Sequence, residues 1–289
     1  MYAVIDRLVT GIGLAVTAVC QALSVSRSGF YAWQDEREAF RTQRDRELMP
    51  LIRNIFWRHK RRYGARRIAQ ELRFQGEPCG VARAARLLKT EGLRAIQPKS
   101  FRPRTTESRH TLGYSPNLLA GRAAPTRINE VWVGDITYIR LKRRGFGYLS
   151  LLMDLFSRRI VGWEFSESMT EPLVLSSLRS AIVSRQPAAG LIHHTDRGGQ
   201  YAGTRYRGVL RRAEMAQSMS GADNCYDNAF QESCFGTLKT ELELDEFEDA
   251  VEAVRELSNY ITYYNVERRH SSLDYLTPTE FETKHASRK

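Results

Sequence analysis

The stretch VWVGDITYIRL, residues 131–141, decides the fold because it has the composition of a buried strand and carries an acid in its middle. Its β-branched and aromatic side chains favour an extended backbone. A carboxylate in the interior of such a strand is costly unless it is paired or bound to a metal ion. Asp135 therefore predicts a cationic partner or a metal site at this point of the fold.

The residues that follow predict an antiparallel meander and then a helix. Short turns join 131–141 to two further strands, and Thr170 is expected to cap a helix at about 171–185. GLIHHTD, residues 190–196, has the pattern of a fourth, buried strand. A helix between strands is typical of an α/β layered fold. The second and third strands are YLSLLMDLFS (148–157) and RRIVGWEFS (158–166).

Two more acids occupy positions that call for an explanation. Asp196 ends the fourth strand just before a glycine pair, and Glu232 lies in the first turns of a helix predicted at about 228–242. Two-metal phosphoryl transfer requires convergent carboxylates, because Mg²⁺ prefers oxygen ligands. Asp154, near the end of another predicted strand, is expected either to support the metal-binding residues or to have a structural role.

The charge of the chain is concentrated in its front half. The 289 residues include 44 Lys and Arg against 33 Asp and Glu, a formal net charge of +11. Residues 1–128 hold 24 basic and 10 acidic residues, whereas residues 129–289 hold 20 and 23. A strongly basic segment predicts a polyanionic partner, with nucleic acid as the leading candidate.

The segment AVTAVCQALSVSRSGFYAW, residues 15–33, has helix-turn-helix spacing. An apolar helix is expected to end near Leu23, and a second helix is expected to begin after Ser26 as its cap. A small helical hairpin that binds nothing explains the pattern equally well, so DNA contact at this hairpin stays open.

A second helix-turn-helix is predicted over residues 63–96. It follows a charged helix at 35–62 that we expect to be broken or kinked at Pro50. A solvated basic surface is the alternative, but two such hairpins in a basic segment favour DNA binding. The expected buried face is Ile68, Leu72, Val81, Ala85 and Leu88, and the candidate DNA contacts are Arg61, Arg62, Arg66, Arg67, Arg83 and Arg86.

The end of the chain predicts two helices. An acidic helix is expected at 245–264, and TPTE at 277–280 has the pattern of a capping box with Thr277 as the cap. The apolar stripe expected on the acidic helix is Val251, Val254, Ser258, Ile261 and Tyr264.

Four blocks of the sequence resemble the integrase catalytic core of OrfB-type insertion-sequence transposases, in the retroviral-integrase, RNase H-like superfamily. Thirty-five residues separate Asp196 from Glu232, which is the spacing in that superfamily's Asp, Asp, Glu (DDE) triad. The segments SRSGFYAW and YGARRIAQEL resemble the helix-turn-helix segments that precede the core in this group. The four blocks are WVGDITYI (132–139), HTDRGGQY (194–201), DNAFQESCFGTLKTEL (227–242) and YYNVERRHSSLDYLTP (263–278).

The resemblance implies an α/β fold with an all-helical front. We expect an RNase H-like integrase core, with a mixed five-stranded sheet flanked by helices, after the helix-turn-helix region. The implied domains are a DNA-binding region at 1–96, a basic linker at 97–127, a catalytic core at 128–245 and a helical extension at 246–289.

The resemblance also implies roles for single residues. Asp135, Asp196 and Glu232 would be the catalytic, metal-binding triad for two Mg²⁺ ions, with Mn²⁺ as a substitute. Lys239 resembles the family's lysine two turns after the glutamate and would contact the scissile DNA end, unless it only faces solvent.

Three further residues are candidate DNA contacts with a plain alternative. Asn228, at the start of the glutamate helix, either bonds a phosphate or only caps that helix. Arg268 and Arg269 either contact the DNA backbone or belong to a solvated loop.

The implied function is that of a DDE-type transposase, a polynucleotidyl transferase. It would cleave the ends of an insertion sequence and catalyse strand transfer by two-metal phosphoryl transfer. The expected partners are double-stranded DNA, as terminal inverted repeats and as target, and further copies of the chain on paired ends. A cytoplasmic, bacterial location is expected, with nucleoid association on DNA and no membrane.

An OrfA partner or fusion is a further implication of the resemblance. No sustained leucine heptad precedes residue 128, so the chain is either the OrfB product alone or a variant whose first helices recognise the ends. Two other functions remain as alternatives, a DNA-binding regulator without catalysis and an RNase H-like nuclease without joining activity. The three acids argue against the first and the basic front half against the second.

Overall fold

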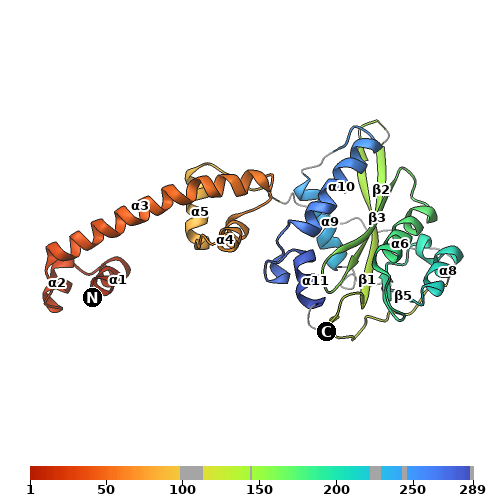
Figure 1. Ribbon diagram of the computed structural model, residues 1–289, viewed down its shortest axis with the longest axis horizontal. Helices are drawn as coiled ribbons and strands as arrows, with labels where there is room; N and C mark the ends of the chain where they lie inside the picture. Colours follow the sequence, from red (N-terminus) through yellow and green to blue (C-terminus); the bar gives the residue numbers. More distant parts are fainter. Residues whose placement is uncertain (98–112, 144, 222–228, 243–245, 287–289) are drawn as a thin grey trace. The chain divides into compact units, whose positions relative to one another are not determined.

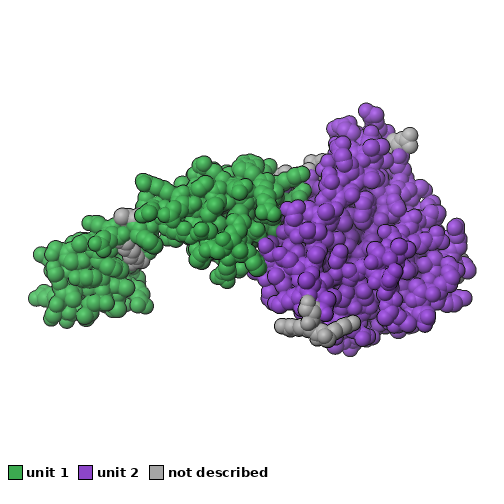
Figure 2. All heavy atoms as spheres, in the orientation of Figure 1, with its two compact units in different colours: residues 1–95 green, residues 96–289 purple. Residues whose placement is uncertain are grey.

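The computed structural model describes residues 1–97, 113–143, 145–221, 229–242 and 246–286. The chain divides into two compact units, residues 1–95 and 96–289 (Figure 2). Each unit encloses its own hydrophobic clusters, so each is described separately.

The first unit is entirely helical over its described residues (Figure 1). One apolar cluster joins the helices near the N-terminus, and a second joins the end of the long helix to the two helices that follow it. Both helix-turn-helix candidates are therefore packed helical hairpins. The helices are α1 (Tyr2–Ile12), α2 (Val16–Ala22), α3 (Arg27–Arg58), α4 (Ala65–Phe74) and α5 (Val81–Thr90).

Helix α3 is a single helix of 32 residues, which corrects the expectation of a break at Pro50 and of a separate helix from residue 35. Ser26 caps it as predicted, because its Oγ accepts a hydrogen bond of 3.4 Å from the Gly29 N–H. A proline removes one backbone N–H. Leu48 and Ile52, on either side of Pro50, are buried in the second cluster, and this packing holds the helix across the missing bond.

The buried face of the second hairpin is only partly as predicted. Ile68 and Leu72 of α4 are fully buried, as is Leu88 of α5. Val81 is 43% exposed and Ala85 is also exposed, so these two predictions are wrong. Helix α5 begins at Val81, which places that residue in its first turn, and Ala84 and Leu87 take the core positions.

The second unit contains a five-stranded mixed sheet in the order β3-β2-β1-β4-β5. Strands β1, β2 and β3 form the predicted antiparallel meander, and β4 and β5 add in parallel beside β1. The expected mixed five-stranded sheet is confirmed. The strands are β1 (Val131–Leu141), β2 (Gly145–Asp154), β3 (Ile160–Ser166), β4 (Ile192–Thr195) and β5 (Ala216–Met219).

Helices cover both faces of this sheet (Figure 1). One hydrophobic cluster packs the sheet against α6 and α8, and the other packs it against α9 and α10. The segment after residue 245 thus shares a core with the sheet. The helices of this unit are α6 (Glu171–Arg185), α7 (Gly199–Ala202), α8 (Thr204–Arg212), α9 (Ala229–Glu241), α10 (Ala250–Val266) and α11 (Pro278–Ala286), with a short 3₁₀ turn, η2 (Ser271–Leu273).

The buried face of the acidic helix differs from the expected apolar stripe. Val251 and Val254 are 77% and 41% exposed, so their predicted burial is wrong. Ala253 and Leu257 are buried instead, together with the aromatic residues later in α10, and these larger side chains decide the orientation. The capping box is confirmed, because the Thr277 N–H donates to the Glu280 carboxylate at 2.8 Å and the Glu280 N–H donates to the Thr277 hydroxyl at 3.1 Å.

Candidate active site

The parallel ladder between β1 and β4 sets the position of both aspartates. Its last paired residues are Gly134 and Thr195. Asp135 and Asp196 follow these two residues directly, so they leave the ladder at the same level of neighbouring strands. This explains how Asp135, in the middle of β1, and Asp196, sixty-one positions later, come to lie on neighbouring strands where the β1–β4 ladder ends.

Glycine at position 134 permits this ladder to close. A Cβ at this position would lie 2.9 Å from Cε1 of His193, which is completely buried on β4. The His193 ring is held by a hydrogen bond of 2.6 Å between its Nε2 and the Tyr206 hydroxyl. Burial, with a smaller contribution from the neighbouring His194, lowers the pKa of His193 to about 3, so its ring is neutral.

Backbone amides orient the two carboxylates. The Ile136 N–H donates to Oδ1 of Asp135 at 2.7 Å, and the Gly198 N–H donates to Oδ1 of Asp196 at 2.9 Å. The loop after β4 is held in turn by Arg197, whose Nε donates to the Ser220 carbonyl at 2.8 Å. Both carboxylates are half-buried, which leaves part of each open to a ligand.

Tyr201 of α7 connects the two aspartates electrostatically. Burial raises the pKa of its phenol well above the usual value, and the negative charges of Asp135 and then Asp196 raise it further. Its hydroxyl is buried and has no hydrogen-bond partner among the residues that the structure describes. Sequence reasoning missed this residue, although Tyr201 closes the HTDRGGQY block that contains Asp196.

Helix α9 brings Lys239 to the same place. Burial lowers the pKa of Lys239, and the negative charge of Asp135 partly opposes that effect. The lysine is half-buried, so its ammonium group lies within electrostatic reach of the first aspartate rather than out in solvent. The charge of Asp135 thus acts on both Tyr201 and Lys239, and the charge of Asp196 acts on Tyr201.

Glu232 belongs to α9 by its backbone, but its side chain lies outside the described residues. Asn228 also lies outside them. Among the side chains that the structure describes, no group of three or more His, Cys, Asp or Glu is placed to hold a metal. The donors at the site are carboxylate oxygens, which suit a hard divalent cation.

Arg268 occupies a different environment from the one expected. It is 5% exposed, and its Nη2 lies 2.7 Å from Oε1 of Glu241, which is also buried. A buried, paired guanidinium cannot reach a phosphate, so the expected DNA contact by Arg268 is corrected. Arg269 donates to the Glu280 carboxylate at 2.8 Å and is partly covered.

The candidate arginines of the first unit differ in how accessible they are. Arg66 is exposed on α4, whereas Arg67 is half-buried and donates to the Arg62 carbonyl at 3.3 Å. On α5, Arg83 and Arg86 lie 3.4 and 2.6 Å from the Asp45 carboxylate of α3. Arg61 and Arg62 are half-buried at the turn after α3.

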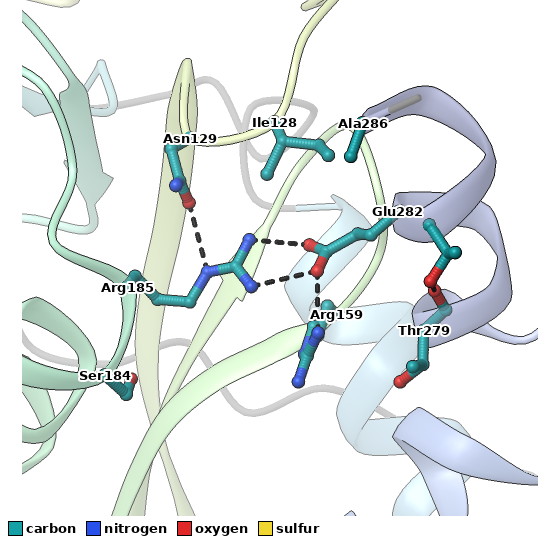
Figure 3. Close-up of a pocket in the computed structure, with 9 residues that line it drawn as sticks. Ile128, Asn129, Arg159, Ser184, Arg185, Thr279, Glu282 and Ala286 are labelled. Atoms are coloured by element: carbon teal, nitrogen blue, oxygen red, sulfur yellow. Dashed lines mark hydrogen bonds and ion pairs between the residues drawn. The ribbon is translucent and has the colours of Figure 1, made fainter. Parts of the chain in front are cut away.

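Asp154 is structural, which is one of the two roles expected from the sequence. Its carboxylate accepts hydrogen bonds from the Asn129 and Ser157 N–H groups at 2.6 and 2.9 Å, and also bonds the Ser157 hydroxyl. Beside it, Arg185 and Glu282 border a hollow of about 350 Å³ (Figure 3). Glu282 neutralises the arginines there, which marks this hollow as a packing junction.

No helix in the described part of the chain is long and apolar enough to cross a membrane. The helical first unit and the sheet with its aspartate pair define an integrase-core protein with a helix-turn-helix-like front. Residues 43–101 match an HTH-like domain, and residues 125–225 and 213–278 match an integrase core domain.

Two relatives that are similar over almost the whole chain identify the family. The chain is 41% identical over 269 residues to an uncharacterized 31 kDa protein of insertion element IS600 from Shigella sonnei, covering 92% of this chain and 98% of that protein. It is 39% identical over 274 residues to transposase InsF for insertion sequence IS3A from Escherichia coli K12, covering 93% and 94%. The chain belongs to the InsF-like transposases of IS3-type insertion sequences, which confirms the resemblance in its sequence blocks.

Solved integrase structures resemble the fold at low sequence identity. The HTLV-2 integrase catalytic core domain in complex with magnesium is 16% identical, with a TM-score of 0.43 over 53% of this chain and 96% of that chain. A simian T-cell lymphotropic virus intasome in complex with a PP2A regulatory subunit is 19% identical, with a TM-score of 0.47 over 74% and 70%.

Proposed function

We propose that this transposase cleaves the ends of its insertion sequence and transfers the freed 3′-hydroxyl to target DNA by two-metal phosphoryl transfer. The observation that carries the proposal is the shared position of Asp135 and Asp196 at the end of the β1–β4 ladder. Two carboxylates at one sheet edge form the start of a site for hard cations, and Glu232 on α9 is the proposed third ligand.

Asp135, Asp196 and Glu232 would hold two Mg²⁺ ions, with Mn²⁺ as a substitute. Such ions, when bound, stabilise the attacking and leaving oxygens of an in-line displacement. The protein supports this arrangement through the amide bonds of Ile136 and Gly198, which fix one oxygen of each aspartate. The other carboxylate oxygens are then oriented by the strand and loop.

Lys239 is the proposed contact to the scissile DNA end. Its position near Asp135 supports this role, because a phosphate bound between the carboxylates would meet the ammonium group. Exposed Arg66 is the foremost proposed contact in the first unit, with Arg61, Arg62 and Arg67 around it. Arg83, Arg86, Arg269 and Asn228 complete the proposed DNA-contacting set.

The proposed division of labour follows the chain. Residues 1–96 would recognise the terminal inverted repeats and 97–127 would link them to a catalytic core at 128–245, with 246–289 as an extension. Binding of two ends and of target DNA implies more than one copy of the chain, and an OrfA segment, as partner or fusion, is a further proposed participant. A cytoplasmic, nucleoid-associated location follows from DNA as the substrate.

The test is a junction assay in cells. The chain is expressed beside its native flanking DNA, and abutted element ends are amplified, with Glu232→Gln and Asp135→Asn as controls. Junctions from the native protein alone support the proposal. Junctions that persist in both variants refute the triad, and cleaved ends that are never joined refute strand transfer in favour of a nuclease.

If neither the native protein nor its variants yields junctions, the assay is repeated with OrfA supplied. Asp135→Asn is expected to bind element ends within a few-fold of the native affinity, because phosphate contacts supply most of the binding free energy.

A further inference from the structure

A buried ion pair anchors the last residue of α9. The Arg268 Nε donates to both carboxylate oxygens of Glu241, at 3.0 and 2.8 Å, and its Nη2 donates to Oε1 at 2.7 Å. The Tyr260 hydroxyl of α10 donates to the same carboxylate at 3.1 Å. Glu241 and Arg268 are 7% and 5% exposed, so the pair lies inside the core.

This pair is an unusual way to fill a core. Burial alone would lower the pKa of Arg268, but the hydrogen bonds and charge of Glu241 raise it above its ordinary value, so the guanidinium stays charged. A buried ion pair adds little to stability compared with a well-packed apolar pair of similar volume. What it does supply is a fixed geometry, because a guanidinium meets a carboxylate in one planar arrangement.

The anchor and the active-site residues occupy different sides of α9. Glu241 lies two residues after Lys239, about 200° around the helix axis, so the two side chains project from opposite sides. Among the described residues, Phe235 and Leu238 of α9 also enter the core as apolar side chains, and the thiol of Cys234 is hydrogen-bonded to Tyr264. Apolar contacts have no preferred direction and permit a helix to rotate or slide by small amounts.

Arg268 is in turn connected, through side-chain contacts, to the sheet that carries the aspartates. Its guanidinium lies over the Tyr264 ring, 5.5 Å from the centroid. The Tyr264 hydroxyl lies 3.9 Å from the sulfur of Met153 on β2, and Met153 pairs with Val133 on β1. Val133 is two residues before Asp135. A chain of contacts therefore connects the ion pair at the end of α9 to the strand that carries the first aspartate.

We propose that the Glu241–Arg268 pair sets the rotation and axial position of α9 beside the strands that carry Asp135 and Asp196, so that Lys239 reaches Asp135. Arg268 is thus a positioning residue, and this assignment rests on the proposed role of the triad. It gives the block YYNVERRH a function inside the catalytic unit in place of DNA contact.

A second buried pair in the same unit provides a matched control. Arg185 and Glu282 form two hydrogen bonds of 2.7 and 2.9 Å, with side chains 14% and 9% exposed (Figure 3). This pair ties α6 to α11, and among the described residues its hydrogen bonds go to Asn129, Ser157 and Arg159 and none to α9. Its loss removes at least as many hydrogen bonds, because Glu282 also bonds Arg159 and Ser157.

The experiment compares two apolar double variants of the full chain, E241L/R268M and R185M/E282L. Thermal melting reports folding, Mn²⁺ titration followed by electron paramagnetic resonance reports the metal site without DNA, and cleavage of an end duplex gives kcat and KM. We expect E241L/R268M to raise the Mn²⁺ dissociation constant and lower kcat by about 10-fold or more, with KM within about two-fold. R185M/E282L is expected to keep both within about two-fold of the native chain.

A well-folded E241L/R268M with native Mn²⁺ affinity and kcat overturns the proposal, and so does an equal loss in both double variants. If E241L/R268M does not fold, Arg268→Lys keeps the charge but not the planar fork. The same loss of Mn²⁺ affinity in that variant supports positioning, and native affinity overturns it.

The same measurements distinguish a failure of the proposed transfer reaction from a failure of the proposed positioning role. A native chain that binds Mn²⁺ but never cleaves ends overturns the transfer reaction, while the Mn²⁺ titrations still test positioning. A native chain without Mn²⁺ affinity overturns both.

Discussion

Gly134 and Thr195 are the final pair of the parallel β1–β4 ladder, and the two aspartates of the candidate site are their immediate successors in the chain. The active-site geometry therefore depends on how closely strands β1 and β4 approach each other at the residues just before the two aspartates.

Substitution of Gly134 by Val is expected to lower stability and activity together. The new Cβ would begin 2.9 Å from Cε1 of buried His193, and overpacking of this kind costs about 1–3 kcal/mol. Urea unfolding measures the loss, and Mn²⁺ affinity should fall with it. Gly236→Ala is the control, because a Cβ there meets nothing within 4 Å and alanine favours the helix. A Gly134→Val protein as stable as Gly236→Ala would contradict the packing described here.

Tyr201→Phe and Tyr206→Phe are expected to change stability in opposite directions. The Tyr201 hydroxyl is buried without a hydrogen-bond partner among the described residues, so its removal should stabilise the metal-free chain by about 1 kcal/mol. The Tyr206 hydroxyl bonds Nε2 of His193 at 2.6 Å, so its removal should cost about 1–3 kcal/mol. Chemical denaturation of the two variants provides the comparison, and a destabilised Tyr201→Phe would show that this hydroxyl is bonded in solution.

Stability is expected to fall as the pH is lowered from neutrality, in part because of His193. The folded protein keeps this imidazole neutral down to a pKa of about 3, whereas the unfolded chain binds a proton below about 6.5. The unfolded state therefore gains protons first, and stability is lost at up to about 1.4 kcal/mol per pH unit. Denaturation of the native chain at pH 7 and pH 5 should differ by more than in His193→Gln, and equal differences would argue against a neutral buried His193.

Arg66→Ala is expected to weaken DNA binding and to flatten its salt dependence. One lost phosphate contact lowers the slope of log affinity against log salt by about 0.9. The measurement is a titration of an end duplex at several salt concentrations. Arg211→Ala on α8, also exposed but in the other unit, serves as the control. An unchanged slope in Arg66→Ala would exclude this residue from the interface.

Much of the fold follows from local patterns in the sequence. The strand around Asp135, the meander after it, the Ser26 cap and the capping box at Thr277 are all set by neighbouring residues, and the structure contains each of them. Strand β5, four residues of AQSM without strong β propensity, has no such local pattern and forms because it pairs with β4.

The errors have a common physical origin in tertiary packing. Pro50 is a helix breaker by its local chemistry, yet packing around Leu48 and Ile52 keeps α3 continuous. Arg268 looks like a surface cation in sequence, because its partner Glu241 lies 27 positions away and is brought to it only by the fold. Tyr201 is likewise connected to the aspartates in space alone.

The contact between Arg185 and Glu282 of α11 has a consequence for folding during synthesis, because the two residues are made at different times. Arg185, the last residue of α6, donates to the Asn129 side chain, but its carboxylate partner Glu282 lies 97 residues later. At about 5–20 residues per second, synthesis leaves this guanidinium without its counter-ion for roughly 5–20 seconds. The catalytic unit therefore completes its core only when the last helix has been made, and a prematurely ended chain would carry a cation that its core cannot neutralise.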